Sequence, residues 1–174
     1  MKISILKVII FSFIIFSLSI FWLGLKINNN YDTKSLIGSQ ISNFQLTEIN
    51  NDEQYISRED LRKNKYTLIN FFASWCAPCR TEHKYLLSLS NKNKEIKIVG
   101  INFKDKKINA NNFLKELGNP YGFVGEDADG KTSILFGIYG IPESILLNNE
   151  LIVIKKIIGP IDQIQHDEIL RLTQ

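Results

Sequence analysis

The sequence predicts an α/β domain preceded by one N-terminal transmembrane helix, and three observations support that prediction. The chain from Val8 to Leu25 contains no charged residue. After it, β-prone apolar segments alternate with segments whose apolar residues recur at helical spacing. The two cysteines, Cys76 and Cys79, lie where one such strand meets one such helix. A length of 174 residues then leaves room for one membrane helix and one domain of ordinary size.

The N-terminal apolar run has the features of a membrane anchor. As a helix it rises about 1.5 Å per residue and nearly spans the hydrocarbon core of a bilayer. Phe21 and Trp22 suit the membrane interface, Lys2 and Lys7 precede the run, and Lys26 follows it. The larger positive charge on the first side predicts that the N-terminus stays in the cytoplasm and that the domain is exported.

A cleaved signal peptide is the alternative interpretation of this run. Signal peptides usually have an apolar region of about 7–15 residues and a cleavage site of small residues. The run here is longer, and the sequence KINNN that follows it offers no Ala-x-Ala site. We therefore expect an uncleaved anchor over residues 1–27, a polar tether over 28–35 and a single domain over 36–174.

The distribution of charge along the chain argues against a nucleic-acid-binding domain. The net charge of +3 arises from Lys2, Lys7 and Lys26, because the rest of the chain carries 18 basic and 18 acidic residues. A nucleic-acid-binding surface needs clustered positive charge to displace counterions from phosphates. We therefore expect no nucleic-acid partner.

The first half of the domain shows two strands and two helices. Ser57 followed by Asp60 is typical of a helix N-terminus. The apolar, β-prone runs 66–72 and 96–101 predict buried strands. Between them, residues 78–89 place apolar side chains at helical spacing, which predicts a helix.

The second half predicts two further helices and a hairpin. Residues 109–117 predict a helix that stops at the sequence GNP over 118–120. The apolar runs 144–147 and 151–157 flank a polar turn and predict a β-hairpin, with Lys155 and Lys156 expected as charges on a sheet edge. Residues 160–172 predict an amphipathic last helix.

The segment ASWCAPCR over 73–80 is the main candidate site. It places Cys76 at the start of a helix, where unpaired N–H groups and a partial positive charge stabilise a thiolate. Cys79 lies one step into the helix, where it can resolve a mixed disulfide. A zinc half-site and an inert disulfide are the alternatives. Zinc needs a second ligand pair, and His83 and His166 have no suitable spacing.

A second element of interest is the sequence GIYGIPE over 137–143, a loop with Pro142 just before a strand. An X-Pro bond is the one place where a cis peptide costs little. A cis Ile141–Pro142 bond would offer the backbone of Ile141 to an extended substrate segment. An ordinary proline at the start of a strand explains the same pattern.

Four segments together resemble a known family. The segments WCAPCRTEH, KIVGINFKD, FLKELGNPY and GIYGIPESILL resemble the membrane-anchored thiol–disulfide oxidoreductases of cytochrome c maturation, the DsbE/CcmG family. The likeness covers about residues 36–173. It implies a thioredoxin-like fold, a central mixed sheet flanked by helices, with Cys76 as the exposed nucleophile, Cys79 as the resolving thiol and Pro142 in cis.

The resemblance also implies a function and partners. The protein would reduce the disulfide of the CxxCH haem-attachment motif in apocytochrome c, directly or through a cytochrome c maturation thiol protein. Its electrons would come from a membrane reductant of the DsbD/CcdA type, and no cofactor or metal is implied. The expected location is the bacterial inner membrane, with a single span and the catalytic domain in the periplasm.

Two acidic residues match positions associated with the active site of this family. Glu82 lies one helical turn beyond Cys79, and Glu143 follows Pro142. A carboxylate near a thiol opposes the helix field or relays a proton to a departing thiolate. Solvated surface charges are the alternative for both. Asn70 stands where cytosolic thioredoxins carry a buried Asp, so proton transfer at Cys79 must use another group.

Two other functions are compatible with the same segments. One is a general periplasmic reductase similar to TlpA, with clients outside cytochrome assembly. The other is a copper-binding module similar to the Sco proteins, which use a CxxxC pair and a distant His. The spacing CxxC here favours disulfide chemistry over copper binding.

Overall fold

The computed structural model describes residues 5–26 and 36–174, and it separates into two compact units that we describe one at a time. One unit holds the N-terminal helix α1 and the other holds everything from residue 36 onward. The predicted tether over 28–35 lies outside the described residues.

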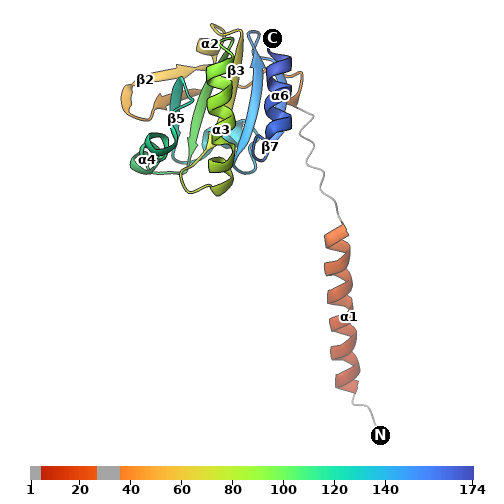
Figure 1. Ribbon diagram of the computed structural model, residues 1–174. Coiled ribbons are helices and arrows are strands. Elements are labelled where there is room, and N and C mark those ends of the chain that lie inside the picture. Colours follow the sequence, from red (N-terminus) through yellow and green to blue (C-terminus); the bar gives the residue numbers. More distant parts are fainter. Residues whose placement is uncertain (1–4, 27–35) are drawn as a thin grey trace. The chain divides into compact units, whose positions relative to one another are not determined.

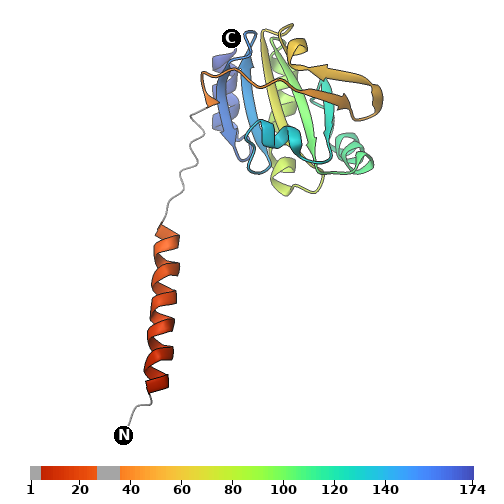
Figure 2. The ribbon, with the colours of Figure 1, turned by 180° about the vertical axis from the view of Figure 1, so that it is seen from behind.

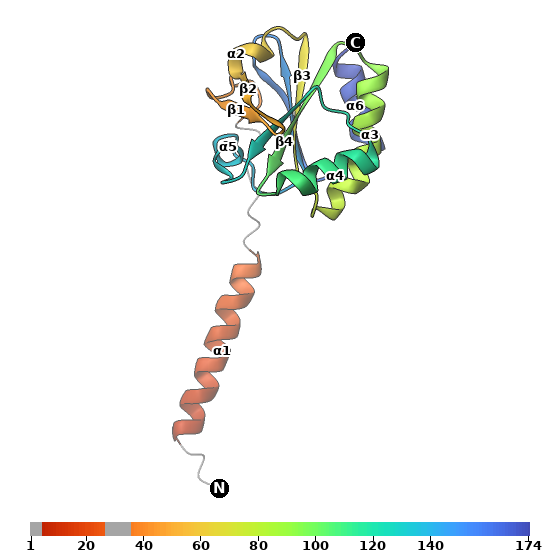
Figure 3. The same ribbon diagram turned by 90° about the vertical axis from the view of Figure 1, so that its left-hand side faces the viewer.

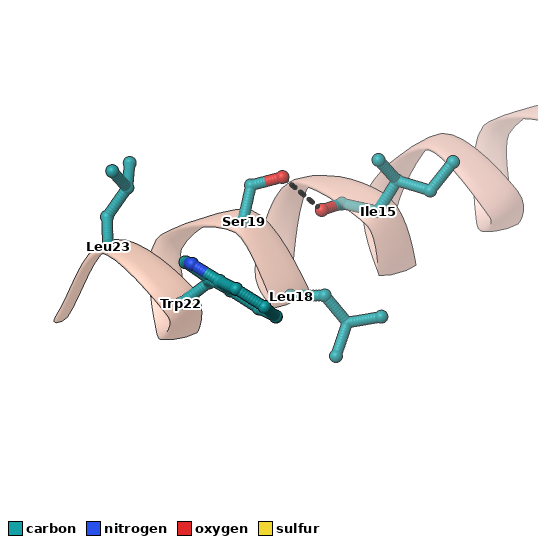
Figure 4. Close-up of a pocket in the computed structure, with 5 residues that line it drawn as sticks. All are labelled: Ile15, Leu18, Ser19, Trp22 and Leu23. Atoms are coloured by element: carbon teal, nitrogen blue, oxygen red, sulfur yellow. Dashed lines mark hydrogen bonds between the residues drawn. The ribbon is translucent and has the colours of Figure 1, made fainter. Parts of the chain in front are cut away.

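The helix α1 (Ile5–Lys26) is long and apolar enough to cross a bilayer. Its segment Ile5–Gly24 has a mean hydropathy of 2.4, and none of it is buried against other parts of the protein. The hydroxyl of Ser19 donates to the carbonyl of Ile15 at 2.9 Å, so this polar group is satisfied within the helix (Figure 4). These properties support membrane anchoring.

The second unit is built on a seven-stranded sheet in the order β2-β1-β5-β4-β3-β6-β7 (Figure 1). The central strands β3, β4 and β5 are parallel, whereas β6, β7, β1 and β2 are added in antiparallel fashion. The strands are β1 (Gln45–Glu48), β2 (Asn51–Ser57), β3 (Tyr66–Phe72), β4 (Ile96–Phe103), β5 (Phe123–Asp127), β6 (Glu143–Asn148) and β7 (Val153–Ile158).

Helices cover both faces of this sheet (Figure 3). One face carries α3 (Ala77–Lys92), α4 (Lys107–Leu117) and α6 (Gln163–Leu172), and the other carries the short helices α2 (Arg58–Leu61) and α5 (Lys131–Leu135). The segment from residue 36 to β1 also crosses this second face (Figure 2).

A separate apolar core lies on each side of the sheet. The consecutive residues Phe71 and Phe72 point to opposite cores, as the alternation of a strand requires. Phe72 packs with Phe113 of α4, and Phe71 packs with Phe136. The sheet is therefore buried on both faces, which confirms the predicted thioredoxin-like arrangement.

Most predicted elements are present at or near the expected residues. The strand over 66–72 is β3, and the helix over 109–117 is α4, which begins two residues earlier. At the N-terminus of α2, the Asp60 carboxylate accepts hydrogen bonds from the backbone and hydroxyl of Ser57 at 3.0 and 2.7 Å. Gly118 ends α4 with a φ of +90°, a conformation that glycine adopts without strain.

The structure differs from the predictions in two respects. The strands β1, β2 and β5 and the helix α5 were not predicted. In β2 the first residues are all exposed, so no apolar alternation marks the strand. The prediction of a charged sheet edge is correct for the position of β7 but wrong for Lys156, whose side chain is only 1% exposed.

Candidate active site

The two cysteines form a disulfide at the start of α3. Cys76 is the N-cap residue of this helix, and its sulfur lies 2.03 Å from that of Cys79. The backbone N–H of Cys79 donates to the Cys76 sulfur at 3.2 Å. An N–H group at a helix N-terminus thus points at the atom that would carry the thiolate charge. In this oxidised form Cys76 is 4% exposed and Cys79 1%, so Cys76 is less open than predicted.

The loop that leads into the cysteines is held by the segment after β4. The carboxylate of Asp105 accepts hydrogen bonds from the backbone N–H and the hydroxyl of Ser74, at 2.7 and 3.0 Å. The indole N–H of Trp75 donates to the carbonyl of Lys104 at 3.3 Å, while the ring stays 60% exposed. Trp75, the residue before Cys76, is therefore held by its indole nitrogen while most of its ring stays exposed.

The Pro142 loop reaches the same end of the sheet. In the antiparallel pairing of β3 with β6, Phe71 lies opposite Glu143. Pro142 therefore stands beside the end of β3, where the chain turns toward the cysteines. The bond between Ile141 and Pro142 is cis. Ile141 packs against the core that contains Cys76 and Cys79. The fold thus brings two segments together that are far apart in the sequence.

Glu82 is buried inside the domain and is not a surface charge. One carboxylate oxygen accepts a hydrogen bond from the Asn70 amide and the other from the backbone N–H of Ile161, both at 2.8 Å. Burial raises the pKa of Glu82 to about 7, against the effect of these two hydrogen bonds. The group can therefore exchange a proton near neutral pH.

Asn70 connects Glu82 to two further side chains. Its amide also donates to the Ser144 hydroxyl at 3.0 Å, and its carbonyl accepts from the Tyr121 hydroxyl at 2.8 Å. Tyr121 is buried, which raises the pKa of its hydroxyl well above 10, and the nearby Glu82 adds to the shift. Tyr121 therefore stays neutral and acts as a hydrogen-bond donor to Asn70.

Glu143 is also buried, but its environment is different. One carboxylate oxygen accepts from the backbone N–H groups of Tyr139 and Gly140, at 2.9 and 3.1 Å. The other lies 3.1 Å from the ammonium group of Lys156. The carboxylate of Glu143 thus faces its own loop and a cation. The alternative interpretation of Glu82 and Glu143 as solvated surface charges is wrong, because both residues are buried.

Sequence reasoning did not assign roles to Tyr121, Asp105 or Lys156. Tyr121 and Asp105 belong to quoted segments that resemble the family, and this was the only available signal for them. The imidazole of His83 donates through Nε2 to the carbonyl of Gly118 at 2.8 Å, and burial lowers its pKa. This hydrogen bond of His83 therefore links α3 to the C-terminal end of α4.

Comparison with known proteins identifies the family. Residues 36–170 match the sequence profile of the redoxin family. The chain belongs to the redoxin family. Within it, the chain is similar to proteins named thiol:disulfide interchange proteins. It is 36% identical to the protein DsbE of Pseudomonas aeruginosa over 140 residues. This matched segment covers 80% of this chain and 76% of the relative.

Two other matches are a curated relative and a solved structure. The protein CycY of Rhizobium leguminosarum bv. viciae is 51% identical over 98 residues, which is 56% of this chain. The matched part spans about half of that relative's length, 52%. The crystal structure of a DsbE protein from Chlorobium tepidum superposes with a TM-score of 0.69, covering 79% of this chain and 98% of the other at 24% identity, and so shows the shared fold.

Proposed function

We propose that the protein is a membrane-anchored thiol–disulfide oxidoreductase that reduces protein disulfides during maturation of c-type cytochromes. The proposal rests on one observation, the Cys76–Cys79 pair at the start of α3 beside the Pro142 loop. The names of its relatives support the same chemistry. The proposed client is the disulfide of the CxxCH motif in apocytochrome c, or a maturation thiol protein that acts between the two.

The proposed reaction proceeds by two thiol–disulfide exchanges. In the reduced protein, the thiolate of Cys76 attacks one client sulfur, and the other client sulfur leaves as a thiolate and takes up a proton. Cys79 then loses its proton and attacks the Cys76 sulfur, which closes the Cys76–Cys79 disulfide and releases the second client sulfur as a thiol. The client gains two electrons and two protons. A dithiol reductant in the membrane, of the DsbD/CcdA type, would return them.

Three further residues have proposed roles in this reaction. Glu82 lies one helical turn beyond Cys79 and would accept the proton that Cys79 loses, because its pKa of about 7 suits transfer in both directions. The loop at Pro142 would bind the client backbone next to the cysteines. Glu143 would hold that loop in place through its hydrogen bonds to Tyr139 and Gly140.

The chain organisation is part of the same proposal. Residues 1–27 would anchor the protein in the bacterial inner membrane, residues 28–35 would form a tether, and the domain over 36–174 would work in the periplasm. The helix Ile5–Gly24 supports the anchor, because its length and hydropathy fit a bilayer.

Trapping of the mixed disulfide tests the client assignment. In Cys79→Ser the first exchange proceeds but resolution cannot, so a disulfide-linked complex through Cys76 should accumulate in cells. Cys76→Ser is the matched control and should trap nothing. The complex is identified by mass spectrometry after non-reducing electrophoresis. The proposal predicts apocytochrome c or a maturation thiol protein in it. A trapped partner unrelated to cytochromes, with normal cytochrome assembly in both variants, would show that the client is wrong.

A further inference from the structure

A buried ion pair lies directly behind the Pro142 loop. The ammonium group of Lys156 on β7 is 3.1 Å from the Glu143 carboxylate at the start of β6, and the two side chains are 1% and 2% exposed. Lys156 lies opposite Ile145, and Glu143 lies opposite Ile158, so the pair joins diagonal neighbours on one face of the β6–β7 ladder. Because removing one partner of a buried pair is costly, the two charges are expected to act as a unit.

Both members of this pair bind the backbone of the loop. Lys156 donates to the carbonyl of Gly137 at 2.6 Å, and Glu143 accepts from the N–H groups of Tyr139 and Gly140. The ammonium group also lies 5.4 Å from the centre of the Tyr139 ring. The pair therefore fixes the loop at one carbonyl, two N–H groups and one aromatic ring.

These contacts tie the Glu143 carboxylate to the loop and to Lys156. Its carboxylate faces two N–H donors and the ammonium group of Lys156. Glu82, in contrast, contacts only the neutral Asn70 amide and the Ile161 N–H in its hydrogen bonds. The carboxylates of Glu82 and Glu143 therefore have different partners.

We infer that Lys156 is a positioning residue, and that Lys156 and Glu143 together hold residues 137–142 in the conformation that receives the client backbone. The inference rests on the disulfide exchange proposed above and adds a residue that sequence reasoning placed on an exposed edge. It predicts that Glu143 works through its hydrogen bonds and its charge balance with Lys156.

A series of charge-neutralising variants separates this role from acid–base catalysis by Glu143. The variants are Lys156→Met, Glu143→Gln and the double variant, tested with an oxidised CxxCH peptide and with the small disulfide 5,5′-dithiobis(2-nitrobenzoate). Each single variant leaves one buried charge unpaired and should slow peptide reduction about tenfold. The double variant leaves no buried charge, and the Gln oxygen still accepts from the loop, so its rate should return to within about threefold of the native rate.

The small disulfide has no peptide backbone to pair with the loop. All variants should therefore reduce it at rates within about threefold of the native protein. Lys155→Met is the matched control, because Lys155 is the adjacent lysine of β7 but pairs with Glu168 of α6 on the other face. It should leave both rates unchanged. Lys156→Arg keeps the charge and should retain most of the peptide activity, which covers the case in which Lys156→Met folds poorly.

Three results would overturn the inference. The first is a double variant no faster than Glu143→Gln alone, which would indicate that Glu143 acts by its own proton. The second is an equal loss with both disulfides. The third is the same loss in Lys155→Met.

Amide hydrogen exchange keeps the test independent of the proposed function. The amides of Tyr139 and Gly140 should exchange faster in Lys156→Met and recover in the double variant, even if the native protein reduces neither disulfide. In that case the proposed function fails while the structural role of Lys156 stands. Unchanged exchange in Lys156→Met would overturn the positioning role itself.

Discussion

At the scale of single residues, the two buried carboxylates of Glu82 and Glu143 differ in the groups that bind them. Glu143 faces a cation and two N–H donors, whereas Glu82 is bound by a neutral amide and one N–H group. Burial dominates at Glu82 and raises its pKa from 4.5 to about 7. The surroundings of Glu82, and not its residue type, therefore give it a pKa that suits proton transfer near neutral pH.

This raised pKa predicts how stability depends on pH. Between pH 4.5 and about 7 the unfolded chain ionises Glu82 while the folded protein keeps the proton, so the folded state binds more protons. The contribution of Glu82 is fully present below pH 4.5 and is lost as pH rises through 7, by up to about 3 kcal/mol. Glu82→Gln should flatten this decline when unfolding free energies of the oxidised protein are measured in urea from pH 4.5 to 8.

Glu53→Gln is the control for this measurement, because Glu53 is exposed on β2. It should leave the slope of stability against pH as it is in the native protein. If Glu82→Gln keeps the native slope between pH 5 and 7, the pKa of Glu82 is not raised in the folded protein, and Glu82 lacks the near-neutral pKa on which its proposed proton exchange with Cys79 depends.

At the scale of elements, the junction between β3 and α3 depends on a loop from a different strand. Asp105, just after β4, accepts two hydrogen bonds from Ser74, and Lys104 accepts one from Trp75. These contacts place the residues that precede Cys76. The position of the cysteines relative to the sheet therefore rests on the β4–α4 connection as well as on α3 itself.

Removal of the Asp105 carboxylate should loosen this junction. Asp105→Ala leaves the Ser74 N–H and hydroxyl without their acceptor, which should lower the unfolding free energy by about 1–3 kcal/mol. Asp52→Ala is the matched control, because its ion pair with Lys107 joins side chains that are 80% and 41% exposed and should contribute little to stability. Denaturant unfolding of both variants measures the difference. Equal effects would mean that Asp105 does not hold the loop.

The elements also show which features the sequence could predict. The strand β3, the helices α3 and α4 and the cysteine pair depend on local patterns, and all were predicted. The contacts of Glu82 depend on Asn70 from β3 and Ile161 before α6, which are separated from it by 12 and 79 residues. No periodicity encodes such contacts, because they arise only when the sheet and helices pack. The strand β2 was missed because its side chains are mostly exposed.

At the scale of the whole chain, the net charge of +3 belongs to the N-terminal segment and not to the domain. Lys2 and Lys7 precede the apolar helix and Lys26 follows it, while the rest of the chain is neutral. Charge of this kind sets the orientation of a membrane helix, since lysines next to the membrane are retained on the cytoplasmic side.

Orientation can be tested with the full chain fused at its C-terminus to alkaline phosphatase, which is active only outside the cytoplasm. The native fusion should be active and should resist extraction from membranes by alkaline carbonate, since the helix Ile5–Gly24 has a mean hydropathy of 2.4. Replacement of Lys2 and Lys7 by Ser removes the charge bias and should lower the active fraction. Lys26→Ser, the matched control, strengthens the bias and should not. An inactive native fusion would reverse the orientation, and a carbonate-soluble protein lacking its first residues would identify a cleaved signal peptide instead of an anchor.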